Sequence, residues 1–423
     1  MDKPFYWRRV RYSGRSINSM SPAPSLNPSG QTRNIPPTVW ALGFVSLLMD
    51  ISSEIIHSLL PVFLVSVLGA GVQTVGLIEG VAEATAMLTR VFSGSLSDWL
   101  GKRKILALLG YGLGALSKPL FALAPCVGLV FTARFVDRVG KGIRGAPRDA
   151  LVADVTPPER RGAAYGLRQS LDSVGAFLGP LLAIGLMFLS GGQFRLIFWV
   201  AFVPGILALV VLWLGVKEPV STARKPFRSP LSRQSLALLG QRYWLVVLVG
   251  IVFTLARFSE AFLLLRAENV GLRLSLIPLV LVVMNIAYSL TAYPVGHLSD
   301  RIGRQGLMAL GLIVLIGSEL LLALAGGLWM VLAGTALWGI HMGLTQGLIS
   351  TLVADSITPE LRGTAFGVFG LASGVALLLA SLIAGWLWQE FGASATFWGG
   401  ALFAALALLA FLGLKQGEKD PIS

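Results

Sequence analysis

Long apolar segments separated by short polar connections recur along the whole chain. Twelve of them lie between residues 37 and 414, most close to the roughly 20 residues that cross a bilayer as a helix. They lack the period-two alternation of membrane β-barrel strands. We therefore predict an all-α polytopic membrane protein with twelve transmembrane helices, which satisfy their own backbone hydrogen bonds in lipid. The predicted spans are residues 38–66, 72–97, 104–126, 128–150, 162–190, 194–216, 243–265, 274–298, 305–325, 328–353, 363–389 and 394–414.

An internal repeat divides these segments into two sets of six. The stretch LVADVTPPERRGAAYG from Leu151 matches LVADSITPELRGTAFG from Leu352 without gaps, at an offset of 201 residues. A second match relates GSLSDWLGKR from Gly94 to GHLSDRIGRQ from Gly296, at an offset of 202. Two matches in register indicate a parallel repeat of two six-helix bundles, as in transporters.

The repeat and the polar stretches predict five regions. Residues 1–36 form a disordered basic tail, 37–216 the first bundle, 217–242 a basic linker, 243–414 the second bundle and 415–423 a short tail. No apolar segment follows the first charges, so the N-terminus is not expected to be a cleaved signal peptide.

Composition agrees with a membrane protein. Charged residues make up 13% of the chain, against about 25% in a soluble domain. The net charge of +13 concentrates in the tails and in alternate loops, which favours the positive-inside rule over nucleic-acid binding. We expect a multi-pass protein of a bacterial inner membrane with both termini in the cytoplasm.

Several chemistries lack their sequence signals. The single cysteine, Cys126, and histidines without ligand spacing argue against a metal site, so no cofactor is expected. The sequence shows no Walker motif, no G-x-S-x-G and no H-E-x-x-H, which argues against an enzyme.

The two related loops carry a known pattern. GSLSDWLGKR and its second copy resemble the cytoplasmic loop signature of the major facilitator superfamily, although Trp99 occupies a position that is usually basic. The resemblance implies a gating role for these loops and for the charged positions of the longer repeat. The expected gating residues are Gly94, Asp98, Gly101, Arg103, Asp154, Arg161, Gly296, Asp300, Gly303 and Arg304.

Two further motifs extend the resemblance. RVGKG from Arg138 is similar to the family's R-x-x-Q-G pattern, with a lysine in place of glutamine. Gly175, Gly179 and Pro180 resemble the antiporter signature G-x-x-x-G-P, and this resemblance favours export over uptake. The signature is incomplete after the proline. The chain also resembles bacterial permeases, some of them related to iron or siderophores.

Ionisable residues interrupt the apolar spans. Asp50, Glu54 and His57 fall within roughly 60° on one face of the first helix. Each acidic group at the bilayer centre costs about 2.5–3.5 kcal/mol on insertion scales, so this face needs a cavity or partners. Burial raises the pKa of a carboxyl group and a nearby arginine lowers it, so a carboxylate with a moving arginine partner can exchange protons. The candidates for proton coupling are Asp50, Glu54, Glu83 and Asp172.

Basic residues concentrate in the third to fifth helices, whereas the second half is poorer in charge. This surplus hints at an anionic or zwitterionic substrate, unless the acids of the first helices neutralise it. The alternative to binding is a fixed network of ion pairs. The candidate substrate-binding residues are Lys118, Arg134, Arg138, Lys141, Arg168, Arg257 and Glu260.

Together these features predict a secondary transporter that moves a small solute by alternating access, with proton-coupled export as the first hypothesis. Proton-coupled uptake of an organic anion or an iron- or siderophore-related solute is the second. A transporter-like scaffold or sensor is the third. The expected partners are a small molecule, protons and the bilayer, and a monomer is expected to suffice.

Overall fold

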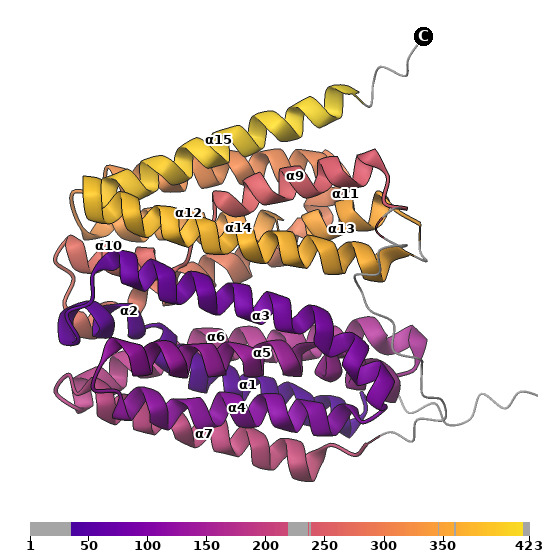
Figure 1. Ribbon diagram of the computed structural model, residues 1–423, viewed down its shortest axis with the longest axis horizontal. Helices are drawn as coiled ribbons and strands as arrows, with labels where there is room; N and C mark the ends of the chain where they lie inside the picture. Colours follow the sequence, from indigo (N-terminus) through magenta and orange to yellow (C-terminus); the bar gives the residue numbers. More distant parts are fainter. Residues whose placement is uncertain (1–34, 219–235, 237, 346, 359–360, 418–423) are drawn as a thin grey trace, which may run out of the picture. The chain divides into compact units, whose positions relative to one another are not determined.

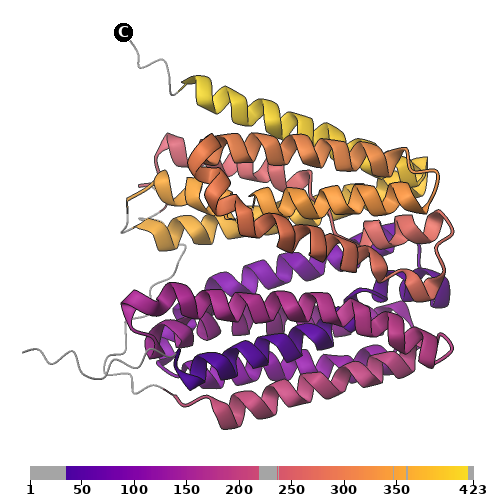
Figure 2. The same cartoon turned by 180° about the vertical axis from the view of Figure 1, so that it is seen from behind.

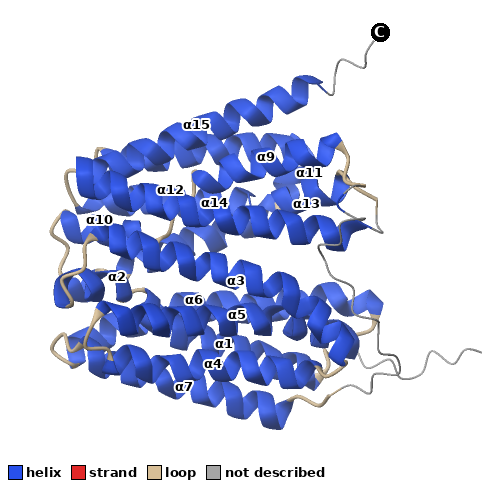
Figure 3. Ribbon diagram, viewed as in Figure 1, coloured by secondary structure: helices blue, strands red, loops and turns tan. Residues whose placement is uncertain are grey.

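The protein is built from helices (Figure 1, Figure 3). The computed structural model describes residues 35–218, 236, 238–345, 347–358 and 361–417. Within these ranges the side chains of residues 293, 296–302 and 414–417 are not described. Residues 1–34 of the predicted tail and most of the predicted linker therefore lie outside the described residues.

The first half contains six long helices and three short helical segments. They are α1 (Pro37–His57), α2 (Leu60–Val62), η1 (Phe63–Val67), α3 (Val72–Leu100), α4 (Arg103–Leu123), α5 (Val127–Val155), η2 (Pro158–Arg160), α6 (Arg161–Leu189) and α7 (Phe194–Gly215).

The second half repeats this order with more interruptions. Its elements are α9 (Gln241–Leu255), α10 (Ala261–Asn269), η3 (Leu274–Leu276), α11 (Leu279–Ala323), α12 (Leu328–Thr345), α13 (Leu348–Asp355), α14 (Arg362–Phe391) and α15 (Ala393–Gly417).

Charge content separates the helices into two kinds. Among the described residues, nine helical segments are long and apolar enough to cross a membrane. The remaining predicted spans are α3, α5 and the interrupted α9–α10 pair. Helices α3 and α5 are long enough to cross a membrane but less apolar than the nine, because they carry many ionisable residues, among them Glu79, Glu83, Arg134 and Arg138. The fold agrees with the predicted helical bundles and twelve spans.

Three predicted spans are interrupted. The first helix breaks after His57 and continues through a π-helical turn. The predicted span 243–265 divides at residues 256–260 into α9 and α10. In the predicted span 328–353, Gly347 has a φ of 73° and directly precedes α13. Conversely, α11 covers two predicted spans, which meet at a kink where Gly303 has a φ of 69°.

The apolar core differs between the two ends of the helices. We call the end where α3 ends and α4 begins the tail end, because α1 starts and α15 finishes there; the opposite end is the far end. At the far end one core joins both halves and includes Phe63, Ile78, Phe262 and Phe397. At the tail end each described core cluster belongs to one half only. Helices α2 and α10 lie side by side at the far end in both views (Figure 1, Figure 2).

Helices α3 and α14 form the most extensive described contact between the two halves. Glycines make the approach possible. A Cβ atom on Gly76 would lie 2.4 Å from the carbonyl oxygen of Ser381, and one on Gly80 would lie 3.0–3.2 Å from Leu378. A backbone atom cannot move aside as a flexible side chain can, so the contact between α3 and α14 requires small residues.

Replacing Gly76 by alanine is therefore expected to destabilise the protein by roughly 1–3 kcal/mol, as overpacking does. Gly112→Ala is the matched control, because nothing lies within 4 Å of its Cβ position. Thermal unfolding of the purified variants in detergent measures the difference. Equal unfolding temperatures for the two variants would show that α3 and α14 can move apart without loss of stability.

Candidate functional site

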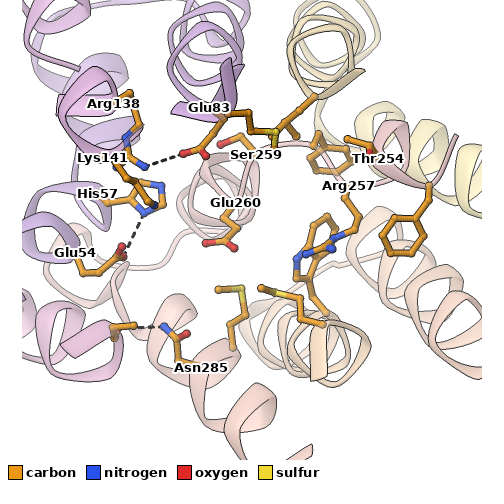
Figure 4. A pocket seen from close by; sticks show the side chains of 18 residues that line it. Glu54, His57, Glu83, Arg138, Lys141, Thr254, Arg257, Ser259, Glu260 and Asn285 are labelled. Carbon is orange, nitrogen blue, oxygen red and sulfur yellow. Dashed lines mark hydrogen bonds and ion pairs between the residues drawn. The ribbon is translucent and has the colours of Figure 1, made fainter. Parts of the chain in front are cut away.

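A cavity of about 410 Å³ lies between the two halves (Figure 4). Its walls come from α1, α3, α5 and α6 of the first half, and from the second half including the break between α9 and α10. The lining residues are Glu54, His57, Glu83, Met87, Arg138, Lys141, Ala176, Phe253, Thr254, Arg257, Phe258, Ser259, Glu260, Met284, Asn285, Trp338, Met342 and Leu377.

The break between α9 and α10 supplies four consecutive lining residues, 257–260. In a continuous helix four consecutive side chains point in directions spread around the whole helix, so most of them could not line the same cavity. Phe258 packs against Trp338 and Phe397, with ring centroids 5.5 and 5.7 Å apart. The interrupted backbone thus holds one aromatic anchor while Arg257 and Glu260 border the cavity.

The first half forms the charged wall. Glu54 and His57 lie on one face of α1, 3.3 Å apart between Oε2 and Nδ1. Glu83 of α3 accepts a hydrogen bond from Arg138 of α5, at 2.9 Å. The side chains of Glu54 and Glu83 are 22% and 27% exposed, so both carboxylates face the cavity despite their partners.

Three lining charges have no oppositely charged partner within 4 Å among the described side chains: Lys141, Arg257 and Glu260. Arg257 instead lies over the ring of Phe253, with its guanidinium carbon 5.5 Å from the centroid. Figure 4 shows Glu260 between the two walls of the cavity. These groups are available to a charged ligand.

Buried ion pairs lie behind the charged wall. Arg134 donates to Glu79 at 2.6 Å, and both side chains are at most 2% exposed. His57 Nε2 lies 3.9 Å from Glu79, which links this pair to the cavity. The pairs join α1, α3 and α5 into one electrostatic unit.

Asp137 is the centre of a second buried network. It accepts a hydrogen bond from Lys118 of α4 at 2.8 Å and another from Arg138 at 3.1 Å. Lys118 also donates to Ser53 of α1 at 3.2 Å. Arg138 therefore belongs to the network and to the cavity wall at once.

Asp50 and Asp172 form a third cluster, outside the lining of the cavity. Their carboxyl groups, from α1 and α6, are close enough to interact electrostatically. Asp172 lies 3.8 Å from Arg148 and 3.6 Å from Arg168. Two neighbouring carboxylates cannot both ionise easily without such cations.

The predicted binding residues thus occupy two environments. Arg138, Lys141, Arg257 and Glu260 line the cavity. The structure places Lys118, Arg134 and Arg168 outside its lining, in ion pairs. Of the predicted coupling residues, Glu54 and Glu83 line the cavity, whereas Asp50 and Asp172 do not. All these roles stay predictions.

The glycines of the antiporter motif bring α6 against the acidic face of α1. A Cβ atom on Gly175 would lie 2.9 Å from the Cβ of Asp50, and one on Gly179 would lie 2.5 Å from that of Glu54. Pro180 follows inside α6. The motif therefore positions both carboxylates, a link that the sequence does not reveal.

The loop motifs give the same ion pair in both halves. Arg103 bonds to Asp154, and Arg304, which aligns with Lys102 of the first loop motif, lies 3.4 Å from Asp355. Arg103 also lies 3.3 Å from Asp98. This equivalence supports the repeat found in the sequence.

The remaining gating candidates have mainly backbone roles or lie outside the described side chains. Gly101 ends α3 with a φ of 64°, and Gly94 faces Ala146 of α5. Arg161 is exposed at the start of α6. The side chain of Asp300 and the environment of Gly296 lie outside the described residues.

Several residues of the site have no local sequence signal. Ser259 reaches the cavity because of the helix break, which no glycine or proline marks, whereas Thr254 lies in the last turn of α9. Asp137 resembles the other charges of its helix, and only the fold shows that it holds two cations. Met87 and Met342 look like ordinary core residues.

A second hollow of about 320 Å³ shares five residues with the cavity and extends toward the tail end, where Ile349, Ser350 and Ser373 line it. The hollow therefore continues from the cavity toward the tail end, whereas the joined core lies at the far end. Within the part of the chain described, no group of three His, Cys, Asp or Glu side chains could hold a metal ion.

Two bundles around a central cavity of mixed polarity define a membrane transporter that binds a small molecule. The family model of the Major Facilitator Superfamily matches residues 42–266 and 246–422, so the chain belongs to this superfamily. It is a multi-pass secondary transporter, not an enzyme.

Three known proteins are similar to the chain. An uncharacterised MFS-type transporter of Methanocaldococcus jannaschii is 34% identical, over 90% of this chain and 95% of that protein. The multidrug resistance protein MdtH of Proteus mirabilis is 26% identical, over 78% of this chain and 82% of that protein. The crystal structure of the nucleoside transporter NupG (D323A mutant) has a TM-score of 0.74 at 13% identity, and the match covers 89% of this chain and 99% of that one. This structural likeness concerns the fold alone.

The Arg134–Glu79 pair gives a stability prediction. Arg134→Gln leaves the buried Glu79 without its main partner, which is expected to cost about 3–5 kcal/mol. The double variant Arg134→Gln/Glu79→Gln is expected to regain part of this loss, because no unpaired charge is left. Unfolding in detergent measures both changes.

Arg90→Gln is the control for this pair, because Arg90 is 65% exposed and lies 3.6 Å from Asp149. It is expected to change stability by less than about 1 kcal/mol. A cost for Arg134→Gln as small as that of Arg90→Gln would contradict a supporting role for the buried pair.

Proposed function

We propose that this protein exports a small amphipathic organic molecule in exchange for protons. The observation that carries the proposal is the cavity, in which two carboxylates with cationic partners share a space with aromatic and methionine side chains. The aromatic and methionine side chains can bind the apolar part of a ligand, while the carboxylates on the opposite side of the cavity take up and release protons. The name of the similar multidrug resistance protein MdtH also supports export.

Orientation follows from the basic loops. Lys102, Arg103 and Lys104 lie at the tail end, as do Arg160 and Arg161, and the positive-inside rule assigns this end to the cytoplasm. In this proposal the membrane is a bacterial inner membrane, both termini are cytoplasmic and the cavity faces inward. A single chain contains the whole cavity, so a monomer suffices.

Coupling uses the partners of the cavity carboxylates. A proton on Glu83 removes the charge that attracts Arg138, and a proton on Glu54 or His57 changes the same wall. Release of Arg138 affects Asp137, which holds α4 to α5 through Lys118. Protonation thus changes the helix contacts of the first half. Since the polar part of the amphipathic substrate meets the same charged wall that takes up the proton, binding of one opposes binding of the other.

The second candidate is proton-coupled uptake of an organic anion. Lys141 and Arg257 favour it, since neither has a carboxylate within ion-pair distance among the described side chains. The sidedness of flux separates the two candidates.

The coupling prediction uses proteoliposomes with an imposed pH gradient and two probes, ethidium and a fluoroquinolone. Glu54→Gln and Glu83→Gln are expected to lower gradient-driven flux at least about tenfold, because neither amide can take up and release a proton. Probe binding to the purified variants checks that the cavity is intact.

Glu390→Gln serves as the control, because Glu390 is exposed near the end of α14. It is expected to keep full flux. Gradient-driven flux that persists in both cavity variants would remove them from the coupling role. Loss of flux in Asp50→Asn alone would move coupling to the Asp50–Asp172 cluster.

A further inference from the structure

A groove of about 630 Å³ lies between α6 of the first half and α11 of the second half, and we call it the α6–α11 groove. Both helices belong to membrane-spanning segments. The groove follows α6 from its middle toward the tail end. Its lining residues are Gly166, Gln169, Ser170, Ser173, Val174, Phe177, Asn285, Ile286, Tyr288, Ser289, Leu290 and Ala292.

Small residues leave this space between the helices open. Gly166, Ser170 and Ser173 are spaced by four and three residues, so they share one face of α6. A Cβ atom on Gly166 would meet nothing within 4 Å. Contact between α6 and α11 is far less extensive than contact between α3 and α14, where backbone atoms lie close to Gly76. The two halves therefore meet tightly at one pair of helices and leave a groove at another.

The groove is open to the surroundings of the bundle. Three of its apolar lining residues, Val174, Ile286 and Leu290, are 44%, 44% and 72% exposed. In a membrane, such side chains on a spanning helix contact lipid chains. Gln169 and Ser289 of the lining are exposed as well. Polar side chains are costly at this depth and often mark the path of a polar solute.

The described lining of the groove contains no Asp, Glu, Lys, Arg or His side chain. Arg168 and Asp172, which adjoin this lining in the sequence of α6, lie 3.6 Å apart. Arg168 also donates a hydrogen bond to Gln169 at 2.7 Å. The side chain of Tyr293, the residue after the lining in α11, is outside the described part of the chain. A solute therefore meets uncharged groups along the groove and charged groups in the cavity.

Asn285 lies at the boundary between the groove and the central cavity, because it lines both. Its Nδ2 donates a hydrogen bond to the carbonyl oxygen of Ala176 at 3.1 Å, and Ala176 also lines the cavity (Figure 4). This bond joins the two halves at the inner edge of the groove. A single neutral hydrogen bond contributes little net free energy, so this boundary can open readily.

We propose that the α6–α11 groove is the entrance through which the transported amphipathic molecule passes from the membrane into the cavity, with Asn285 as its gate. The inference rests on the proposed function, which supplies the class of substrate. Exposed apolar side chains at the outer edge accommodate the apolar part of the molecule, and the uncharged polar side chains accompany its polar part. In the proposed orientation the tail end is cytoplasmic, so the molecule enters from the inner leaflet.

The kinetic test measures binding of ethidium and of a fluoroquinolone by stopped-flow fluorescence, with the full-length protein in lipid nanodiscs. Ser173→Trp narrows the groove and leaves every lining residue of the cavity unchanged. It is expected to lower the association and dissociation rate constants by the same factor, at least about tenfold, because a narrower entrance slows passage in both directions. Kd is then unchanged.

Two further variants complete this test. Leu181→Trp is the control, because Leu181 is 44% exposed on the same helix but does not line the groove, and both rate constants are expected to stay unchanged. Asn285→Ala is expected to raise the association rate constant roughly fivefold, because it removes the hydrogen bond at the inner edge.

A second measurement examines the groove without any substrate. A bimane fluorophore is attached to Ser173→Cys in a Cys126→Ser background, which removes the single cysteine of the chain. Phospholipids with brominated acyl chains are expected to quench this label. The same label on Thr254→Cys is the control and is expected to be quenched much less, because Thr254 lines the cavity but not the groove.

Three outcomes would overturn the proposal. The first is unchanged rate constants in Ser173→Trp, which would indicate entry from water through the hollow at the tail end. The second is a raised Kd with an unchanged association rate constant, which would place Ser173 in the binding site. The third is equal quenching at positions 173 and 254. A wild-type protein that binds neither probe would instead contradict the proposed function, while the quenching still decides whether the groove is open to lipid.

Discussion

Ionic groups inside these helices must be compensated by other protein groups, because the lipid around them supplies neither water nor counter-ions. The arrangement of the first half follows from this constraint. Glu79 requires Arg134, and Asp137 requires Lys118 and Arg138, so α3, α4 and α5 can pack only in one rotational setting. A buried ion pair gains little net stability against an apolar pair, but its loss on one side is costly. The networks therefore specify which faces meet more than they strengthen the contact.

Local periodicity and the repeat were sufficient to predict much of this structure. The spacing of Glu54 and His57 predicts a shared face, because a helix repeats over a few residues. The 201-residue offset relates Asp154 to Asp355 before any coordinates are known, and the structure gives each of them an arginine partner. Which charges face the cavity could not be predicted, because that depends on helix rotation. Arg134 and Arg138 lie one turn apart, yet only Arg138 lines the cavity. The break at residues 256–260 has no glycine or proline, so it follows from tertiary packing.

The repeat also explains why the α5 and α12 positions that line the cavity differ in polarity. Lys141 and Met342 are related by the 201-residue offset, and both line the cavity. The same offset relates Asp137, which holds two cations, to Trp338, which packs on Phe258. Equivalent positions of one scaffold thus carry opposite polarity. A ligand between them meets charge on one side and rings or thioethers on the other, which suits an amphipathic molecule.

The apolar core shared by both halves at the far end has a thermodynamic consequence. Opening the far end during transport must expose part of this core, including the contact of α2 with α10, to water entering the cavity. Exposure of apolar surface raises the heat capacity, and the hydrophobic contribution weakens on cooling. The balance between the two access states is therefore a curved function of temperature. Cooling shifts it toward the state open at the far end, even where no charge, substrate or proton changes.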